Sequence, residues 1–348
     1  MPPLPAADLD HIAAHTAPLW DEVRGQRIFL SGGTGFFGTW LTECFLHINR
    51  TLDLQAHLTV LTRSPSSFAT KSPHLAQDPS LTLHEGDVRN FVYPPGEFAN
   101  VIHAATQASA QQAAEQPLAM LSTILEGTSR VLEFAAQRGT RKLLFTSSGA
   151  VYGKQPATVS HIPEGYLGAP DPLDPTSVYA EGKRTAELLC ALHARNSHIE
   201  IKIARCFAFV GPHLPLDAHF AIGNFLRDAL HNQPITIAGD GTPLRSYLYA
   251  ADLAIWLWTI LFQAPSLQPL NVGSEQAISV SGLAQTVVAT LNRDLPIHIS
   301  SQPTPGETPA QYVPSTHRAQ HLLGLRQRIS LEDAIRRTAA WHTGNMAH

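Results

Sequence analysis

The stretch Arg27-Ile28-Phe29-Leu30-Ser31-Gly32-Gly33-Thr34-Gly35-Phe36-Phe37-Gly38 joins an apolar run of strand length to a glycine-rich turn and the start of a helical pattern. In this position Gly32 and Gly35 would let the backbone turn tightly and approach a pyrophosphate, which the positive end of the helix favours. Gly38 would let the helix pack closely on the strand. This context predicts a dinucleotide-binding turn, with a plain glycine-rich turn as the alternative. The expected cofactor contacts here are Gly32, Gly35, Phe36, Phe37 and Gly38.

Strands and helices alternate along the chain on both sides of this turn. The helical patterns cover residues 8–23, 36–48, 118–137 and 178–194. The further strand-like segments are short, apolar and bounded by turn residues, at 58–61, 81–84, 101–103, 142–147 and 199–207. Such alternation predicts an α/β fold with a Rossmann-type, doubly wound parallel sheet.

The sequence changes in character after Gly211-Pro212. Short helical patterns follow at 221–230 and 252–262, and four prolines lie between Ser301 and Pro314. The segments 248–261 and 270–272 are apolar enough to return to the main sheet. We therefore expect two lobes. The first is a dinucleotide-binding domain over 1–212, with 246–275 returning to it, and the second is a smaller, discontinuous C-terminal substrate-binding lobe over 213–245 and 276–348.

Composition narrows the classes of partner. The 348 residues carry a net charge of −4, and no run of Lys or Arg forms the basic stripe that nucleic-acid binding needs. The N-terminus, Met1 to Ala7, lacks the pattern of a signal peptide, and no apolar run reaches the about 18 residues of a membrane span. We expect a soluble protein that binds neither nucleic acid nor membranes.

The cysteines and histidines give no sign of a metal or a disulfide framework. Cys44, Cys190 and Cys206 lie in apolar segments without paired spacing, as buried thiols of a reducing compartment do, so we expect a cytoplasmic protein. Among the 18 histidines, His11/His15 and His317/His321 have metal-binding spacing on a helix, yet neither pair has a nearby third ligand. No metal is predicted.

Tyr179-Ala-Glu-Gly-Lys183 places a phenol and an ammonium one helical turn apart. An ammonium beside a tyrosine stabilises the phenolate and lowers the phenol pKa from its ordinary value of about 10. Tyr179 is therefore a candidate acid/base, with Lys183 as its partner. A chance spacing on a solvated helix face is the alternative.

Other candidate residues lie at strand ends, where open α/β sheets bind ligands. Arg63, in Thr62-Arg63-Ser64, stands where an acidic residue would bind the adenosine ribose of NAD; it suits a 2′-phosphate and favours NADP over NAD, unless it is an exposed loop arginine. Asp87, followed by Val88, is placed to accept from the adenine amino group or to cap a turn. Ser148 could hydrogen-bond the same oxygen as Tyr179, although Thr/Ser runs at strand ends are often only turn chemistry.

Together these residues resemble the extended short-chain dehydrogenase/reductases, specifically the nucleotide-sugar epimerase/dehydratase group, over nearly the whole chain. The matching parts are the glycine turn, 101–105, the Ser148 segment, Tyr179/Lys183, 205–212, Gly239-Asp240-Gly241 with Arg245, and Asp252. The resemblance implies catalytic roles for Ser148, Tyr179 and Lys183, and a nucleotide-diphosphate sugar as substrate. It adds Ala104, Ala105 and Thr106 to the cofactor contacts. It also implies substrate contacts at Ser148, Gly149, Asn224 and Arg245, whose guanidinium suits a diphosphate, and further sugar contacts at 106–109 and His219 are weaker candidates. By the same analogy the chain forms a homodimer through 118–137 and 178–194.

Departures from the family pattern discriminate between reactions. Members that dehydrate the sugar carry Asp and Glu at the two positions after the catalytic hydroxyl residue, and the decarboxylases carry Glu at the second; here these positions are Gly149 and Ala150. An NDP-sugar 4-epimerase needs only Tyr179, Ser148 and the cofactor. We therefore expect a 4-epimerase. The alternatives are an NADPH-dependent 4-keto-sugar reductase, then a dehydratase or decarboxylase, and last a catalytically idle cofactor-binding protein. Ala208 and Ile124 replace two asparagines usual in the family, so substrate placement differs.

Overall fold

The computed structural model describes residues 2–106, 110–218, 220–306 and 308–346. Within these residues, the main sheet has seven strands in the order β11-β6-β5-β4-β1-β2-β3. Neighbouring strands from β5 to β3 run parallel, with Leu30 opposite Val60 on one side and Ile102 on the other. The predicted Rossmann-type sheet is therefore confirmed. The strands are β1 (Arg27–Ser31), β2 (His57–Thr62), β3 (Leu81–Glu85), β4 (Asn100–His103), β5 (Lys142–Ser148), β6 (Glu200–Cys206) and β11 (Leu270–Val272).

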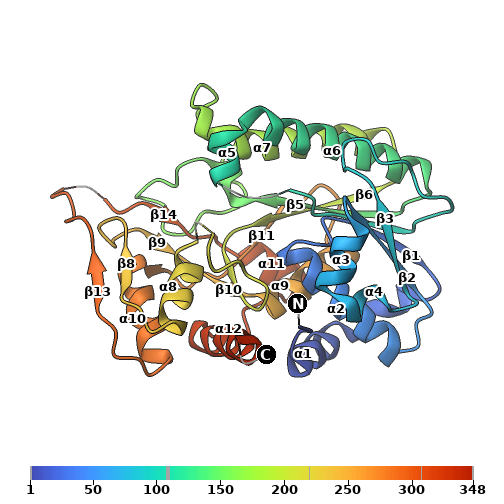
Figure 1. Ribbon diagram of the computed structural model, residues 1–348. Helices are drawn as coiled ribbons and strands as arrows, with labels where there is room; N and C mark the ends of the chain where they lie inside the picture. The colour runs from blue at the N-terminus through green and yellow to red at the C-terminus, as the bar shows by residue number, and fades with distance from the viewer. Residues whose placement is uncertain (1, 107–109, 219, 307, 347–348) are drawn as a thin grey trace. The chain divides into compact units, whose positions relative to one another are not determined.

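Helices cover both faces of this sheet (Figure 1). One face carries α6 (Pro117–Gln137) and α7 (Val178–Arg195), and the other carries α2 (Phe36–Thr51), with α1 (Ala6–Thr16) packed on it. The shorter helices of this region are α3 (Pro65–Lys71), α4 (Pro73–Ala76) and α5 (Ala110–Glu115).

The segment predicted as one helix over 8–23 is instead two elements. The α-helix ends at Thr16, and a 3-10 helix covers Ala17–Val23. Pro18 lies in the first turn of the second element. Because proline has no backbone N–H and clashes with the preceding turn, it cannot continue the α-helix.

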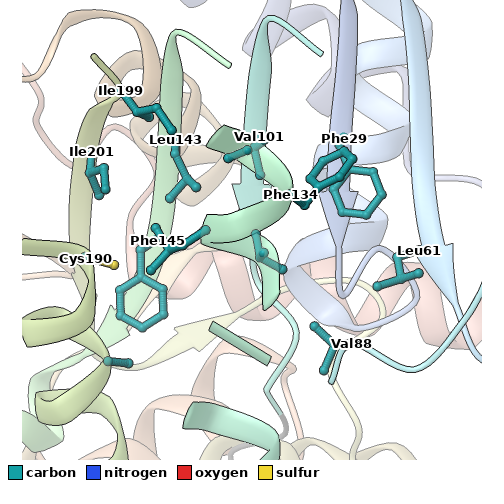
Figure 2. Close-up of a cluster of buried hydrophobic side chains, with 14 of the residues drawn as sticks. Phe29, Leu61, Val88, Val101, Phe134, Leu143, Phe145, Cys190, Ile199 and Ile201 are labelled. Carbon is teal, nitrogen blue, oxygen red and sulfur yellow. The ribbon is translucent and has the colours of Figure 1, made fainter. Parts of the chain in front are cut away.

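The core beneath α6 and α7 combines aliphatic side chains with a cluster of phenylalanines (Figure 2). Phe29 of β1 and Phe134 of α6 are fully buried, with ring centroids 4.4 Å apart, and Phe91 stacks on Phe29 at 5.4 Å. Burying each such ring contributes about 1.5–3 kcal/mol to stability. This packing holds α6 and α7 against the sheet and so sets the height of α7 above β5.

On the opposite face of the sheet, two tryptophans are buried and two lysines bind the C-terminal end of a helix. The Trp20 and Trp258 rings lie 4.8 Å apart, and Trp258 Nε1 donates to Cys44 Sγ at 3.0 Å. Trp258 belongs to α9 (Ala250–Gln263), whose C-terminal carbonyl groups accept from Lys142 Nζ at Phe262 and from Lys202 Nζ at Ala264. Cations at this end interact favourably with the negative pole of the helix dipole.

The apolar segment 248–261, expected to return to the main sheet, adds no strand to it, although residues 254–270 group with that sheet in one compact unit. Leu248–Tyr249 form β10, which pairs with β7 (Phe209–Val210), and the rest is α9; only β11 joins the seven-stranded sheet. A segment buried on all sides is apolar throughout, so periodicity does not separate a buried helix from a buried strand. The predicted helices at 221–230 and 252–262 are confirmed by α8 (Ala221–Leu230) and α9.

The chain divides into two compact units. Unit 1 comprises 1–151, 170–205 and 254–270, and unit 2 comprises 152–169, 206–253 and 271–348. Within unit 2, Asn271 Nδ2 donates to Ile162 O and Ser315 O, and its Oδ1 accepts from Tyr152, so one side chain ties two of the three segments together. The further elements are β8 (Ile235–Ile237), β9 (Leu244–Arg245), β12 (Ile278–Ser279), β13 (Ile297–Ile299), β14 (Gln311–Tyr312), α10 (Val280–Thr290), α11 (His317–Leu323) and α12 (Leu331–Met346).

Candidate active site

The glycine turn between β1 and α2 contains two kinds of glycine. A Cβ at Gly32 would lie 2.4 Å from Ala104 O, and one at Gly38 would lie 2.2 Å from Gly32 O, so the packing of the protein itself requires both glycines. Gly32 also has φ +80°, which disfavours any side chain. A Cβ at Gly35 would meet only Gly32 O, at 3.6 Å. The protein therefore leaves no space for a side chain at Gly32 or Gly38, whereas the space beside Gly35 is open.

The open side of this turn fits a dinucleotide. Gly35 is the N-cap of α2 and has no side chain to accept from the N–H groups of the first helical turn, which begins with Phe36 and Phe37. A pyrophosphate supplies such acceptors, and its charge is favoured at the positive helix end. Ala104 and Ala105 lie against Gly32 and form the adjoining wall.

The ends of β2 and β3 carry two arginines around one carboxylate. Arg63 is exposed after β2. Asp87 accepts from Arg89 Nε at 2.8 Å and Nη2 at 3.1 Å; these hydrogen bonds lower the pKa of the Asp87 carboxyl, and the charge of Arg63 acts in the same direction. Asp87 also caps its own turn by accepting from the Arg89 backbone N–H at 3.0 Å. The Val88 side chain is buried against Gly127 of α6.

Lys183 is held from β5 and lies beside the predicted acid/base. Its side chain is buried, and Nζ donates to Thr146 O at 2.7 Å and to Thr106 Oγ1 at 3.3 Å. The same nitrogen lies 4.8 Å from the centroid of the Phe145 ring and 5.9 Å from that of Tyr179. The structure thus brings Tyr179, Lys183 and Thr106 together, from α7 and the end of β4.

The two serines at the end of β5 have different partners. Ser147 Oγ donates to Glu187 Oε1 at 2.5 Å, whereas Ser148 Oγ accepts from the Ala150 N–H at 3.1 Å. A hydroxyl that accepts a bond keeps its hydrogen for another acceptor. Of the two, Ser148 is therefore the one equipped to donate to a substrate oxygen. The 3-10 turn that follows, Gly149–Tyr152, begins with residues that have no ionisable side chain.

A buried histidine joins the sheet to α6 directly below these groups, and sequence reasoning missed it. Ser31 Oγ lies 2.7 Å from His103 Nδ1, and Thr128 Oγ1 lies 3.1 Å from Nε2. Burial and, to a smaller extent, the charge of Lys183 together lower the pKa of His103 to about 3, so the imidazole is neutral at physiological pH. Only its position at a strand end, before Ala104, marked this residue in the sequence.

Sequence reasoning also missed the partners of Glu187. This residue stands one helical turn beyond Lys183, and its carboxylate accepts from Arg205 Nε at 3.0 Å and from Nη2 at 2.6 Å, in addition to Ser147. The i, i+4 spacing from Lys183 was the available signal.

The predicted substrate contacts in unit 2 lie on separate elements. Arg245 ends β9 between Ile278 and Tyr312 of the neighbouring strands, and its Nη1 donates to Leu244 O at 2.8 Å. The Asn224 amide nitrogen donates to Leu216 O at 3.0 Å and Ala218 O at 2.8 Å when the amide is oriented toward them. The candidates 107–109 and His219 lie outside the described residues.

Neither a metal-holding cluster nor a membrane-spanning helix is found among the residues that the structure describes. No group of three or more His, Cys, Asp or Glu side chains in them is arranged to hold a metal ion. No helix in them is both long enough and apolar enough to cross a membrane.

Known proteins resemble this chain in sequence and in fold. Residues 28–273 match the sequence model of the NAD dependent epimerase/dehydratase family. The UDP-glucuronic acid decarboxylase 2 of Arabidopsis thaliana is 29% identical over 91% of this chain and 68% of its own length. The dTDP-glucose 4,6-dehydratase of Streptomyces venezuelae, a structure that holds NAD, superposes with a TM-score of 0.79 at 20% identity, over 92% of this chain and 98% of that one. The UDP-glucose 4-epimerase of Thermotoga maritima gives 0.76 at 20% identity, over 92% and 100%. Since the family match covers more than half of the chain and agrees with the glycine turn and the Tyr179/Lys183 pair, this protein is an enzyme of the NAD dependent epimerase/dehydratase family.

Proposed function

We propose that the protein modifies a nucleotide-diphosphate sugar by oxidation and reduction at C4, with epimerisation at C4 as the net reaction. The family match supports nucleotide-sugar chemistry, since the similar proteins are named for UDP- and dTDP-sugars. The observation that carries the proposal is the arrangement around Lys183. Its ammonium is anchored on Thr146 O beside Tyr179, while the turn after Ser148 offers no carboxylate.

The catalytic roles follow from the side chains present. Tyr179 takes the proton of the C4 hydroxyl as a phenolate, which the Lys183 ammonium stabilises. Ser148 donates a hydrogen bond to the same C4 oxygen, because its own acceptor position is occupied by the Ala150 N–H. A bound nicotinamide supplies the hydride acceptor and donor. Once the keto sugar has rotated in the site, C4 would take the hydride back on its opposite face while Tyr179 returns the proton to the C4 oxygen, which gives the epimer.

Decarboxylation and dehydration are disfavoured despite the names of the similar proteins. Gly149 and Ala150 stand where those enzymes carry the carboxylates that move additional protons. The Ala150 N–H contacts Ser148 Oγ, so a side chain at this position would lie next to the catalytic hydroxyl. The methyl side chain of Ala150 has no ionisable group and cannot transfer a proton. Oxidation and reduction at C4 need no proton-transferring side chain other than Tyr179 and Ser148.

The cofactor contacts that we propose are Gly32, Gly35, Phe36, Phe37, Gly38, Arg63, Asp87, Val88, Ala104, Ala105, Thr106, Tyr179 and Lys183. Arg63 and Arg89 lie on either side of Asp87, which favours a cofactor with an added phosphate, although the similar dehydratase structure holds NAD. A preference for NADP supports the second candidate function, reduction of an NDP-4-keto sugar by NADPH. The proposed substrate contacts are Ser148, Gly149, Asn224 and Arg245.

One experiment separates these functions. The protein is incubated with UDP-, dTDP-, GDP- and CDP-hexoses, with UDP-glucuronic acid and with an NDP-4-keto sugar, in the presence of NAD, NADP or NADPH, and products are identified by NMR. An epimerase gives a C4 epimer with catalytic amounts of cofactor, whereas a reductase acts only on a 4-keto sugar and consumes NADPH. A pentose or a 4-keto-6-deoxy product would overturn both in favour of decarboxylation or dehydration. Tyr179→Phe should abolish turnover and leave cofactor binding intact; normal activity in this variant would overturn the mechanism.

We also propose that the enzyme is a homodimer that pairs through α6 and α7. Leu118, Leu188 and Leu192 are exposed on these helices by 80%, 58% and 48%. Between the helices lies a hollow of about 460 Å³ whose lining combines leucines with charges of both signs. Arg130 and Glu133 are part of this lining and pair with each other at 4.0 Å.

A further inference from the structure

Tyr179, Lys183 and Glu187 occupy one face of α7 at intervals of one helical turn. The Glu187 carboxylate accepts three hydrogen bonds, one from Ser147 of β5 and two from Arg205 of β6. The Glu187 and Arg205 side chains are only 12% and 14% exposed. This is a nearly enclosed, bidentate ion pair with a third donor, the arrangement in which a buried pair is best satisfied.

The pair attaches α7 to the sheet at a second point. Lys183 binds the carbonyl oxygen of Thr146, and Glu187, one turn later, binds the hydroxyl of Ser147, the next residue of β5. Together with the packing of Ala186 and Cys190 in the core, two hydrogen-bonded attachments a turn apart resist rotation of α7 about its axis. The rotation of α7 decides where the Tyr179 hydroxyl lies.

The pair also sets the electrostatic field around the acid/base. Because Arg205 neutralises Glu187, the positive charge of Lys183 is not cancelled by a carboxylate one turn away. The electrostatic effect of both side chains extends into the core, since Glu187 raises and Lys183 lowers the pKa of the buried Cys190 thiol.

The other charged or titratable groups packed around this face are few or neutral. His103 of β4 is uncharged, and Glu181 and Arg184 of α7 pair with each other at 3.8 Å. From α6, the side chains of Glu126 and Arg130 line the groove toward α7 and carry opposite charges.

We propose that Glu187, with Arg205 and Ser147, is a positioning and charge-balancing group for the Tyr179–Lys183 acid/base pair. This inference rests on the proposed acid/base role of Tyr179. None of its three members touches the reacting atoms in this account; they act through Lys183 and through the orientation of α7.

Two single substitutions should shift the Tyr179 pKa in opposite directions. Glu187→Gln keeps the shape and removes the negative charge, so the uncompensated Arg205 cation should lower the pKa of Tyr179. Arg205→Gln leaves the Glu187 carboxylate uncompensated and should raise it. Eight residues of helix span about 12 Å, and Coulomb's law with an effective dielectric constant of about 20 to 80 gives about 0.3 to 1 pH unit for each. The double variant should return toward wild type, whereas Ser147→Ala should lower kcat several-fold without moving the pKa.

The measurement is the NMR titration of the protein labelled with ¹³Cζ-tyrosine, with the Tyr179 signal assigned by its loss in Tyr179→Phe. It needs no substrate, so it separates this inference from the proposed function. Opposite shifts without turnover of any sugar nucleotide would support the inference and overturn the function. Turnover with an unmoved Tyr179 titration in Glu187→Gln would overturn the inference. If Arg205→Gln does not fold, Glu187→Gln and Ser147→Ala decide the outcome alone, and Glu332→Gln, which removes an exposed charge from α12, is the control.

Discussion

Lys183 Nζ donates a 2.7 Å hydrogen bond to the backbone carbonyl oxygen of Thr146, and this contact joins the middle of α7 to the end of β5. The ammonium is thereby held close to the Tyr179 ring and away from solvent. A charge in this position is worth more than one in water, because the surrounding medium screens it less.

Lys183→Met should therefore reduce kcat by about 100-fold or more at neutral pH, in the range of a lost acid/base contribution. Without the ammonium the pKa of Tyr179 rises, so activity should recover in part as the pH is raised. The measurement is kcat across the pH range. The exposed Lys154→Met is the matched control, and a pH profile identical to wild type in Lys183→Met would contradict the role assigned to Lys183.

Alanine at two glycines should separate folding from cofactor binding. In Gly38→Ala the Cβ would overlap backbone atoms of Gly32 and Gly33 at 2.2 and 2.3 Å, so stability should fall by about 1–3 kcal/mol or more.

In Gly35→Ala the added Cβ has space in the protein, and the φ of −89° suits alanine. Stability should persist while dinucleotide affinity falls about tenfold or more, since the methyl group occupies the side open to the pyrophosphate. Thermal unfolding and calorimetric titration with NAD and NADP measure the two effects. Unchanged affinity in Gly35→Ala would place the pyrophosphate elsewhere.

Arg63→Ala should weaken NADP binding by about tenfold or more, the value of one charged hydrogen bond, and leave NAD binding unchanged. The physical reason is that Arg63 faces the ribose end of the cofactor in the proposed arrangement and has a phosphate to bind only in NADP. Equilibrium dissociation constants for both cofactors provide the test. Arg50→Ala, at another exposed arginine, is the control. An equal loss for both cofactors would show that Arg63 does not read the 2′-phosphate.

His103 should make the fold less stable in mild acid. Its pKa is about 3 in the fold, against an ordinary value near 6.5, so between these pH values the unfolded chain binds one more proton. Stability therefore rises with pH through this window and is lost as the pH falls. From about pH 7.5 to about pH 5 the loss is about 2 kcal/mol. Urea unfolding should show this difference reduced in His103→Gln and unchanged in His198→Gln, an exposed histidine. Equal pH dependence in wild type and His103→Gln would contradict the prediction.

Leu188→Asp should convert the proposed dimer to a monomer, because it places a charge in the apolar part of the α7 surface. Light scattering after size-exclusion chromatography gives the mass. Leu173→Asp is the matched control, since Leu173 is 89% exposed outside α6 and α7. A wild-type protein that is monomeric at high concentration would contradict the dimer itself, and a dimeric Leu188→Asp variant would place the interface elsewhere.

Local sequence predicts much of unit 1, because its elements are marked by local chemistry. The strand before Gly32, the helix after Gly35 and the Tyr179/Lys183 spacing all follow from short-range patterns, and the observed β1, α2 and α7 agree with them. The exceptions are also local in origin. Pro18 divides the first helix, and the apolar segment 248–261 contains the predicted helix but adds no strand to the main sheet.

The contacts of the site were harder to predict than its members. Ser147 and Ser148 are adjacent and chemically identical, and nothing in the sequence says which hydroxyl is occupied. The structure distinguishes them, because Ser147 donates to Glu187 of α7 while Ser148 accepts from the Ala150 N–H in the turn after β5. Glu187 and Arg205 lie 18 residues apart on different elements, so their pairing depends on how α7 packs on the sheet.

The sequence by itself determined the alternation of elements, the glycine turn and the spacing of Tyr179 and Lys183 on one helix, because each depends on residues within one or two helical turns of one another. Tertiary structure alone decided which groups surround that pair. The burial of Lys183, the neutral state of His103 and the balance of Glu187 by Arg205 arise where β4, β5, β6 and α7 meet, and the strength of a charge there depends on burial and distance.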